Sequence, residues 1–194
     1  MSGIYDENYY GSVNYTDYLQ RKDRYVRLAS DINGLLKSLC LDKGPVLDFG
    51  CAVGFCIQAF EDLGYQDVEG VEISEWAIEQ CHKKGLFVND RLHPRDYGIT
   101  LVLDVLEHMT EDEITEWIET LKSNVIVFRM PIVAESGEDY VLEVSRRDPT
   151  HTIRWTQEEW TEWFSYHGYN VFAIDLPTIY TSDGVFAGIA TPIQ

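Results

Sequence analysis

An acidic residue followed by a glycine-rich turn is the feature of the sequence best suited to chemistry. Asp48 ends a short apolar segment, residues 45–47, and Gly50, Ala52 and Gly54 follow it. Glycine is favoured where a backbone turns sharply or approaches a ligand closely, because a Cβ atom obstructs both. The pattern predicts a buried strand, a ligand-binding turn and a helix that presents N–H groups at its start.

The charge of Asp48 indicates which ligand this turn would hold. In dinucleotide-binding folds such a turn meets a pyrophosphate, which a carboxylate would repel. A ligand with an ammonium and a sulfonium group would be attracted instead. The segment resembles motif I of the class I S-adenosylmethionine-dependent methyltransferases, an acid followed by three alternating glycines, with Ala52 in place of the middle glycine. The resemblance implies S-adenosylmethionine as cofactor, S-adenosylhomocysteine as product, and cofactor contacts from Asp48, Gly50, Cys51, Ala52 and Gly54.

A second acidic residue lies where such a fold would place a ribose contact. Residues 67–73 predict the second strand, and Glu72 at its end lies 24 residues after Asp48. Acids at this offset and at a strand end accept hydrogen bonds from ribose hydroxyls. We therefore expect Glu72 to bind the ribose rather than to be merely solvated. Ser74 should cap the following helix, residues 75–84.

The resemblance implies four further cofactor contacts. Ile73 and Trp76 would flank the adenine, although Trp76 also suits a hydrophobic core. Asp90, or its neighbour Asn89, would accept a hydrogen bond from the adenine amino group at the end of a short third strand. Tyr10 belongs to a tyrosine-rich arm, which resembles the segment that closes on the cofactor in small-molecule methyltransferases; packing against the domain is the alternative.

The segment DVLEHM, Asp104–Met109, is the second specific match. It lies at the carboxyl end of the predicted fourth strand, residues 99–106, and resembles the DVLEH signature of small-molecule methyltransferases. Open α/β sheets bind ligands at the carboxyl ends of their strands. The resemblance places Asp104 and Val105 against the methionine part of the cofactor.

Two histidines and four arginines are candidates on the side of the methyl acceptor. His108, with His151 as second candidate, would accept a proton if the acceptor must lose one, since an imidazole titrates near neutral pH. A structural role is the alternative for each histidine. An arginine could bind an anionic acceptor, with ion pairing to nearby acids as the alternative; the candidates are Arg129, Arg146, Arg147 and Arg154.

The remaining patterns predict the elements that position these residues. Two capping boxes, Thr110–Glu113 and Thr156–Glu159, predict helices. Further segments predict a helix over residues 17–39, a fifth strand over 124–132, and two strands over 169–176 and 185–191 that form an antiparallel hairpin. The series resembles a single α/β, Rossmann-like methyltransferase domain with a seven-stranded, mostly parallel sheet. Residues 1–40 would form an arm and helical cap over the cofactor site, residues 41–194 the core, and residues 133–150 a substrate lid.

Composition narrows the possible partners. A net charge of −18 over 194 residues argues against binding to nucleic acid or to an anionic membrane. The four cysteines show no paired spacing, so we expect no metal site and no disulfide framework. Apolar runs are too short to span a membrane, and the first residues lack the features of a signal peptide. We therefore expect a soluble, cytoplasmic protein.

Together these features predict methyl transfer from S-adenosylmethionine to a small molecule. By analogy of the motifs alone, an oxygen atom is the first choice of nucleophile. Two alternatives remain open. One is an NAD-dependent oxidoreductase, which the charge of Asp48 disfavours, and the other is a methyltransferase-like subunit that binds the cofactor without turnover.

Overall fold

The computed structural model describes residues 5–11, 17–179 and 182–193, so Tyr15 and other parts of the tyrosine-rich arm lie outside the described residues. The strands form one seven-stranded sheet of order β3-β2-β1-β4-β5-β7-β6. β1 and β2 pair in parallel, as do β2 and β3, whereas β7 is antiparallel to both β5 and β6. The predicted fold class, with its C-terminal antiparallel hairpin, is confirmed. The strands are β1 (Val46–Phe49), β2 (Val68–Val71), β3 (Val88–Asn89), β4 (Asp96–Leu103), β5 (Lys122–Pro131), β6 (Tyr169–Ala173) and β7 (Val185–Pro192).

The chain divides into two compact units, which are described in turn. The first comprises Met1–His93 with Tyr97–Thr100, and the second comprises Pro94–Asp96 with Leu101–Gln194. None of the helices in the described parts of either unit is long and apolar enough to cross a membrane.

The first unit contains the strands and helices around the glycine-rich turn. The predicted helix over residues 17–39 is a short 3₁₀ helix followed by a long α-helix, which packs on the helix Phe55–Asp62. The predicted helix after the turn and the helix capped by Ser74 are both present. The helices of this unit are α1 (Glu7–Tyr10), η2 (Tyr18–Gln20), α2 (Lys22–Ser38), α3 (Phe55–Asp62) and α4 (Glu75–Lys83).

β1 is longer than the apolar pattern indicated. Asp48 lies inside the strand, opposite Gly70 of β2, and Phe49 is the last strand residue. The prediction that Asp48 ends the strand is wrong because pairing with β2 continues beyond it. The N–H groups of Gly50 and Cys51 both donate to the carbonyl of Val71, at 2.8 and 3.1 Å. The start of the turn is therefore tied to β2.

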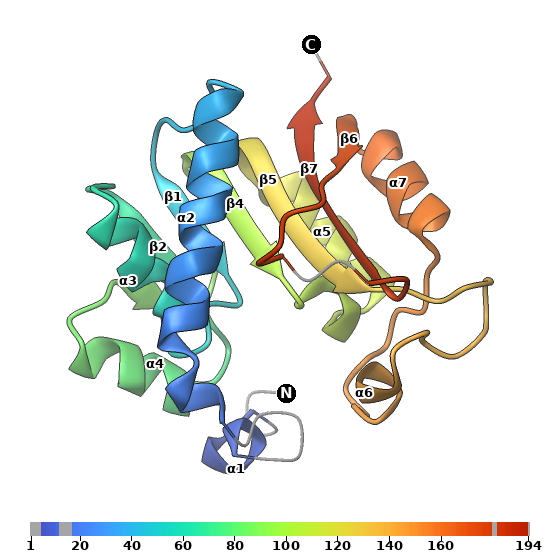
Figure 1. Ribbon diagram of the computed structural model, residues 1–194, viewed down its shortest axis with the longest axis horizontal. Helices are drawn as coiled ribbons and strands as arrows, with labels where there is room; N and C mark the ends of the chain where they lie inside the picture. The colour runs from blue at the N-terminus through green and yellow to red at the C-terminus, as the bar shows by residue number, and fades with distance from the viewer. Residues whose placement is uncertain (1–4, 12–16, 180–181, 194) are drawn as a thin grey trace. The chain divides into compact units, whose positions relative to one another are not determined.

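The second unit contains the two predicted capping boxes and the hairpin. Thr110 and Glu113 cap α5 (Glu111–Thr120), and Thr156 and Glu159 cap α7 (Gln157–Tyr166), each by reciprocal hydrogen bonds. α7 lies beside β6 (Figure 1). Its Phe164 stacks on Phe128 of β5, with ring centroids 5.0 Å apart. Both predicted capping boxes are confirmed. They could be predicted because each joins residues only three positions apart.

Two segments of this unit differ from the expected pattern. β4 ends at Leu103 rather than at Leu106, because Asp104 adopts a left-handed backbone (φ 57°) that breaks the strand. The residues that follow form η3 (Leu106–His108). The segment 133–150 contains a short helix, α6 (Glu143–Arg146), and a buried tyrosine, Tyr140, whose hydroxyl donates to the carbonyl of Ile153. Its role as a substrate lid stays a prediction.

Candidate functional site

The glycine-rich turn has a left-handed backbone at three alternate positions. The φ angles are 76° at Gly50, 48° at Ala52 and 78° at Gly54. A Cβ atom on Gly54 would lie 2.4 Å from Cδ1 of Leu86, so this position admits no larger residue without rearrangement. Ala52 adopts the left-handed region at a cost of about 1–2 kcal/mol. The alternating pattern in the sequence thus reflects the backbone that this turn requires.

Glu72 holds the turn and the start of α4 together. Its Oε2 accepts a hydrogen bond from the Ala52 N–H at 2.8 Å, and its Oε1 accepts from the N–H groups of Ile73 and Ser74, also at 2.8 Å. A carboxylate offers about four acceptor positions, so roughly one position remains for a ligand hydroxyl. The expected ribose contact stays a prediction. The Glu72 carboxylate can accept fewer hydrogen bonds from the ribose than a carboxylate without these N–H donors could. The contact with Ala52 was not foreseen.

Asp48 is a second buried acid beside Glu72. Only 5% of its surface is exposed, and burial, with the Glu72 charge as a second cause, raises the pKa of Asp48 to about 7. Burial also raises the pKa of Glu72, although the three N–H donors oppose that shift. Two buried carboxyl groups of this kind would be stabilised by a cationic ligand, because an opposite charge favours their ionised forms.

Replacing Asp48 with asparagine should flatten the pH dependence of stability. The pKa of Asp48 rises from 3.8 to about 7 on folding. Between these values the folded state keeps a proton that the unfolded state has lost, so the free energy of unfolding falls as pH rises. Above about pH 7 the free energy of unfolding falls no further on account of Asp48, and the total decrease is about 4 kcal/mol at most. Asp48→Asn lacks this contribution, so it should lose less stability than the parent between pH 5 and 8.

Chemical denaturation of ligand-free parent and variant at several pH values measures this difference. Glu79→Gln, on an exposed side chain of α4, serves as the control and should follow the parent. Parallel curves for Asp48→Asn and the parent would contradict the raised pKa.

The tyrosine-rich arm packs on α4. The buried ring of Tyr10 stacks on Trp76, with centroids 5.2 Å apart and planes inclined by 26°. The hydroxyl of Ser74 donates to the carbonyl of Tyr5. Tyr10 also joins a buried cluster with Val53 of the turn. The arm therefore packs beside the turn. This position is compatible with both interpretations of its tyrosines, closing on the cofactor and packing against the domain.

The remaining residues of the expected adenine site differ in burial. Ile73 is 49% exposed. Asp90 is exposed and lies 3.5 Å from Arg91, whereas the side-chain Nδ2 of Asn89 is buried without a hydrogen-bond partner among the described residues. A buried unpaired amide is a better candidate for ligand contact than a solvated carboxylate. An amide nitrogen donates hydrogen bonds, so Nδ2 suits a ring nitrogen of adenine and not its amino group. The adenine contact expected from Asp90 or Asn89 stays a prediction.

In the second unit, Asp104 forms an ion pair with Arg129. The Nε of Arg129 donates to Oδ1 of Asp104 at 2.9 Å, Nη2 donates to Oδ2, and the Asp104 N–H donates to the Arg129 carbonyl. Arg129 therefore orients the carboxylate of Asp104. The next residue, Val105, is half-buried. The expected contact of both residues with the methionine part of the cofactor stays a prediction.

The other three arginines also contact acids or carbonyls of the chain. Arg147 pairs with Glu143, and Arg154 pairs with Asp139 at 3.1 Å; all four side chains are at least half exposed. Arg146 donates to the carbonyl of Tyr140. Ion pairing and backbone contacts, the alternative to an anionic acceptor site, account for these residues.

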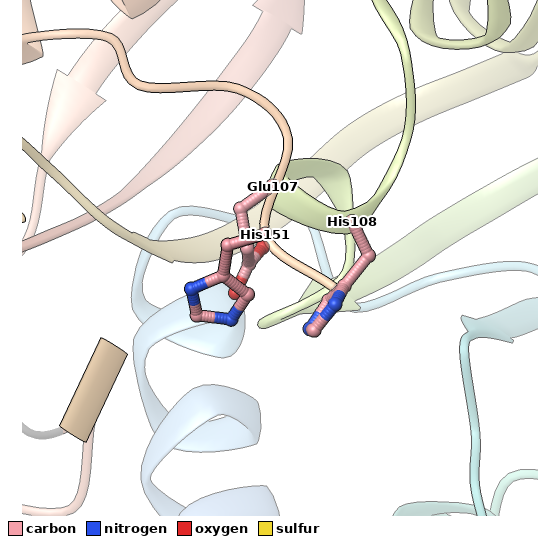
Figure 2. A group of neighbouring side chains, drawn as sticks. All are labelled: Glu107, His108 and His151. Atoms are coloured by element: carbon pink, nitrogen blue, oxygen red, sulfur yellow. The ribbon is translucent and has the colours of Figure 1, made fainter. Parts of the chain in front are cut away.

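The two candidate histidines lie together, as Figure 2 shows. The rings of His108 and His151 have centroids 4.5 Å apart, and Nδ1 of His108 lies 2.7 Å from the hydroxyl of Thr150. Burial lowers the pKa of His108 to about 4, and burial also lowers the pKa of His151. Both imidazoles are therefore neutral at pH 7, and His108 is a weak base for the predicted proton transfer.

Glu107 belongs to the same group and was not among the predicted site residues. Its side chain is 1% exposed, and burial raises its pKa to about 8. Its place beside His108 in the DVLEHM segment was the available signal in the sequence. What the sequence did not show is that His151 folds back onto the same pair.

The strand order, the glycine-rich turn and the acid after β2 together define a Rossmann-like fold built to bind a nucleotide-type ligand. A family model described as a methyltransferase domain matches residues 20–174, which is most of the chain. The chain belongs to this family. It is a class I S-adenosylmethionine-dependent methyltransferase, as the motif resemblance predicted, and the buried acids beside the turn fit that cationic cofactor.

Solved structures share this fold at low sequence identity. DesVI from Streptomyces venezuelae is 18% identical with a TM-score of 0.66, covering 90% of this chain and 94% of that chain. Magnesium protoporphyrin IX methyltransferase (ChlM) from Synechocystis PCC 6803, with bound S-adenosylmethionine, is 14% identical with a TM-score of 0.64, covering 94% and 87%. An S-adenosylmethionine-dependent methyltransferase from Clostridium acetobutylicum is 11% identical with a TM-score of 0.67, covering 93% and 99%. Comparison with curated protein sequences finds no match.

Proposed function

We propose that this protein transfers the methyl group of S-adenosylmethionine to an oxygen atom of a small molecule. The observation that carries the cofactor assignment is the pair of buried acids, Asp48 and Glu72, beside a left-handed turn. The acceptor class is supported by the net charge of −18, which disfavours nucleic acid. One protein of the same fold is named for a small molecule, magnesium protoporphyrin IX.

The residues of the first unit would hold the cofactor by charge and shape. Asp48 would face its positive charge, Glu72 would accept from the ribose, and the backbone of residues 50–54 would lie against it. Tyr10 and Trp76 offer aromatic surface beside the turn. When bound, S-adenosylmethionine supplies an electrophilic methyl carbon for in-line attack. Much of the acceleration then comes from alignment and exclusion of water.

An anionic acceptor is left out of the proposal. Arg129, the most buried of the four candidate arginines with a side chain 16% exposed, pairs with Asp104. The other three contact carboxylates or carbonyls of the chain. These contacts account for the arginines without a ligand.

Ligand-induced stabilisation tests the cofactor. A ligand at about 100 times its Kd stabilises a protein by about 2.7 kcal/mol, which raises the Tm of a chain this long by roughly 5–10 °C. S-adenosylhomocysteine and S-adenosylmethionine should produce such a shift, and NAD should produce none. A shift with NAD alone would overturn the assignment and favour the oxidoreductase.

Turnover separates an enzyme from a binding subunit. Formation of S-adenosylhomocysteine from S-adenosylmethionine would be measured with a panel of small hydroxyl, amine and thiol acceptors, using heat-denatured protein as control. We expect product with at least one hydroxyl compound. Cofactor binding without product across the panel would favour the binding subunit.

A further inference from the structure

Polar atoms of Glu107, His108 and His151 lie close together. One carboxylate oxygen of Glu107 and one ring nitrogen from each histidine all lie within 4.8 Å of one another. Figure 2 shows the three side chains grouped where η3 meets the segment that precedes α7. Two imidazoles and a carboxyl group this close together form a ligand set for a transition metal ion.

The carboxyl group of Glu107 gives a second, independent indication. The residue is 1% exposed, and its Oε2 has no hydrogen-bond partner among the described residues. A buried carboxyl oxygen without a partner is costly, so each such group in a folded protein needs an explanation. A bound cation would satisfy this oxygen, whereas core packing alone leaves it unpaired.

Backbone hydrogen bonds join η3 to the residues that follow His151. The N–H groups of Thr152 and Ile153 donate to the carbonyl of Glu107 at 2.7 and 3.3 Å. These bonds fix the backbone next to His151 against the backbone of η3. Backbone hydrogen bonds therefore help to bring the three candidate ligands together.

The ring of His108 is oriented by a further pair of residues. Its Nδ1 lies 2.7 Å from the Thr150 hydroxyl, which in turn donates to Oδ1 of Asp148 at 2.5 Å. Metal-binding histidines ordinarily use the second ring nitrogen in this way, with a hydroxyl or carboxylate behind the ligand. In this arrangement His108 would offer its other ring nitrogen, Nε2, to a metal.

We propose that Glu107, His108 and His151 bind one divalent first-row transition metal ion, such as Zn²⁺ or Mn²⁺. Three protein ligands leave coordination positions for water or for an oxygen of another molecule, as in catalytic rather than structural sites. The histidines then act as ligands and not as proton acceptors. Metal binding is independent of the proposed methyl transfer; only activation of an acceptor oxygen at the metal would rest on that function.

This site was not expected from the sequence. The cysteines show no metal-binding spacing, and the proposed ligand set contains no cysteine. His151 is far from the other two residues along the chain. Only the fold brings it to them.

Calorimetric titration of the untagged, chelator-treated protein tests the site. Zn²⁺, Mn²⁺ and Co²⁺ would be titrated separately, and at least one should bind at one ion per chain. His151→Ala and Glu107→Gln should each weaken that binding at least tenfold. His82→Ala is the control, because His82 is an exposed histidine whose Nε2 contacts the Val88 carbonyl.

Two further measurements keep the result interpretable. Glu107→Gln retains the shape of the side chain and removes the buried carboxyl group, so its metal-free Tm should match or exceed that of the parent. Co²⁺ bound to the parent should give visible absorption bands that are absent in His151→Ala. Absence of stoichiometric binding by all three metals, or binding unaffected by His151→Ala and Glu107→Gln, would overturn the proposal. Binding of S-adenosylhomocysteine, measured separately, shows whether the cofactor site is intact in either case.

Discussion

Replacing Gly50 with valine is expected to abolish binding of S-adenosylhomocysteine while the protein remains folded. Gly50 has a φ of 76°, and its N–H donates to the Val71 carbonyl at 2.8 Å. A β-branched residue is strongly disfavoured in this backbone region, so valine would move the turn out of its position. Because the cofactor is proposed to lie against this backbone, calorimetry should show an affinity at least a hundredfold weaker than that of the parent.

A second glycine provides a matched control for the backbone strain. Gly85, just after α4, has a φ of 77°, and a Cβ atom there would meet nothing within 4 Å. Gly85→Val should therefore lose a similar amount of stability, measured as Tm, but should bind S-adenosylhomocysteine with nearly parental affinity. Equal loss of binding in both variants would indicate general destabilisation. Parental affinity in Gly50→Val would show that the turn does not hold the cofactor.

The second large effect is expected for Glu72→Ala, which should weaken S-adenosylhomocysteine binding at least thirtyfold. The carboxylate accepts hydrogen bonds from the N–H groups of Ala52, Ile73 and Ser74. Alanine removes these acceptors together with the acceptor proposed for the ribose. Loss of charge-assisted hydrogen bonds of this kind costs about 2 kcal/mol or more, which corresponds to thirtyfold in Kd.

Two ligands separate the role of Glu72 from that of Asp48. 5′-Methylthioadenosine keeps the ribose and adenine but lacks the charged amino-acid part. Glu72→Ala should weaken both methylthioadenosine and S-adenosylhomocysteine to a similar degree, whereas Asp48→Asn should weaken mainly S-adenosylhomocysteine. Glu79→Ala, an exposed residue on α4 that pairs with Lys83, should leave both affinities unchanged. Unchanged affinity in Glu72→Ala would remove the ribose assignment.

The sequence by itself determined the elements whose signals are local. The two capping boxes, the glycine-rich turn and the helix capped by Ser74 all depend on residues within a few positions of one another. Such interactions are set by backbone geometry and side-chain type, so their patterns are visible before folding. The order of these elements, together with the resemblance to class I methyltransferases, then predicted the sheet and its antiparallel hairpin.

Only the tertiary structure decided which partners the polar side chains contact. Glu72 accepts a hydrogen bond from the Ala52 N–H, and Asp104 pairs with Arg129. His151 lies beside Glu107 and His108. Each contact joins residues at least 20 positions apart, so no local pattern specifies it. Burial then sets the protonation of these groups, because the cost of a buried charge depends on every neighbour that the fold supplies. For that reason residue types identified the candidates for the site, whereas only the folded chain could assign their partners.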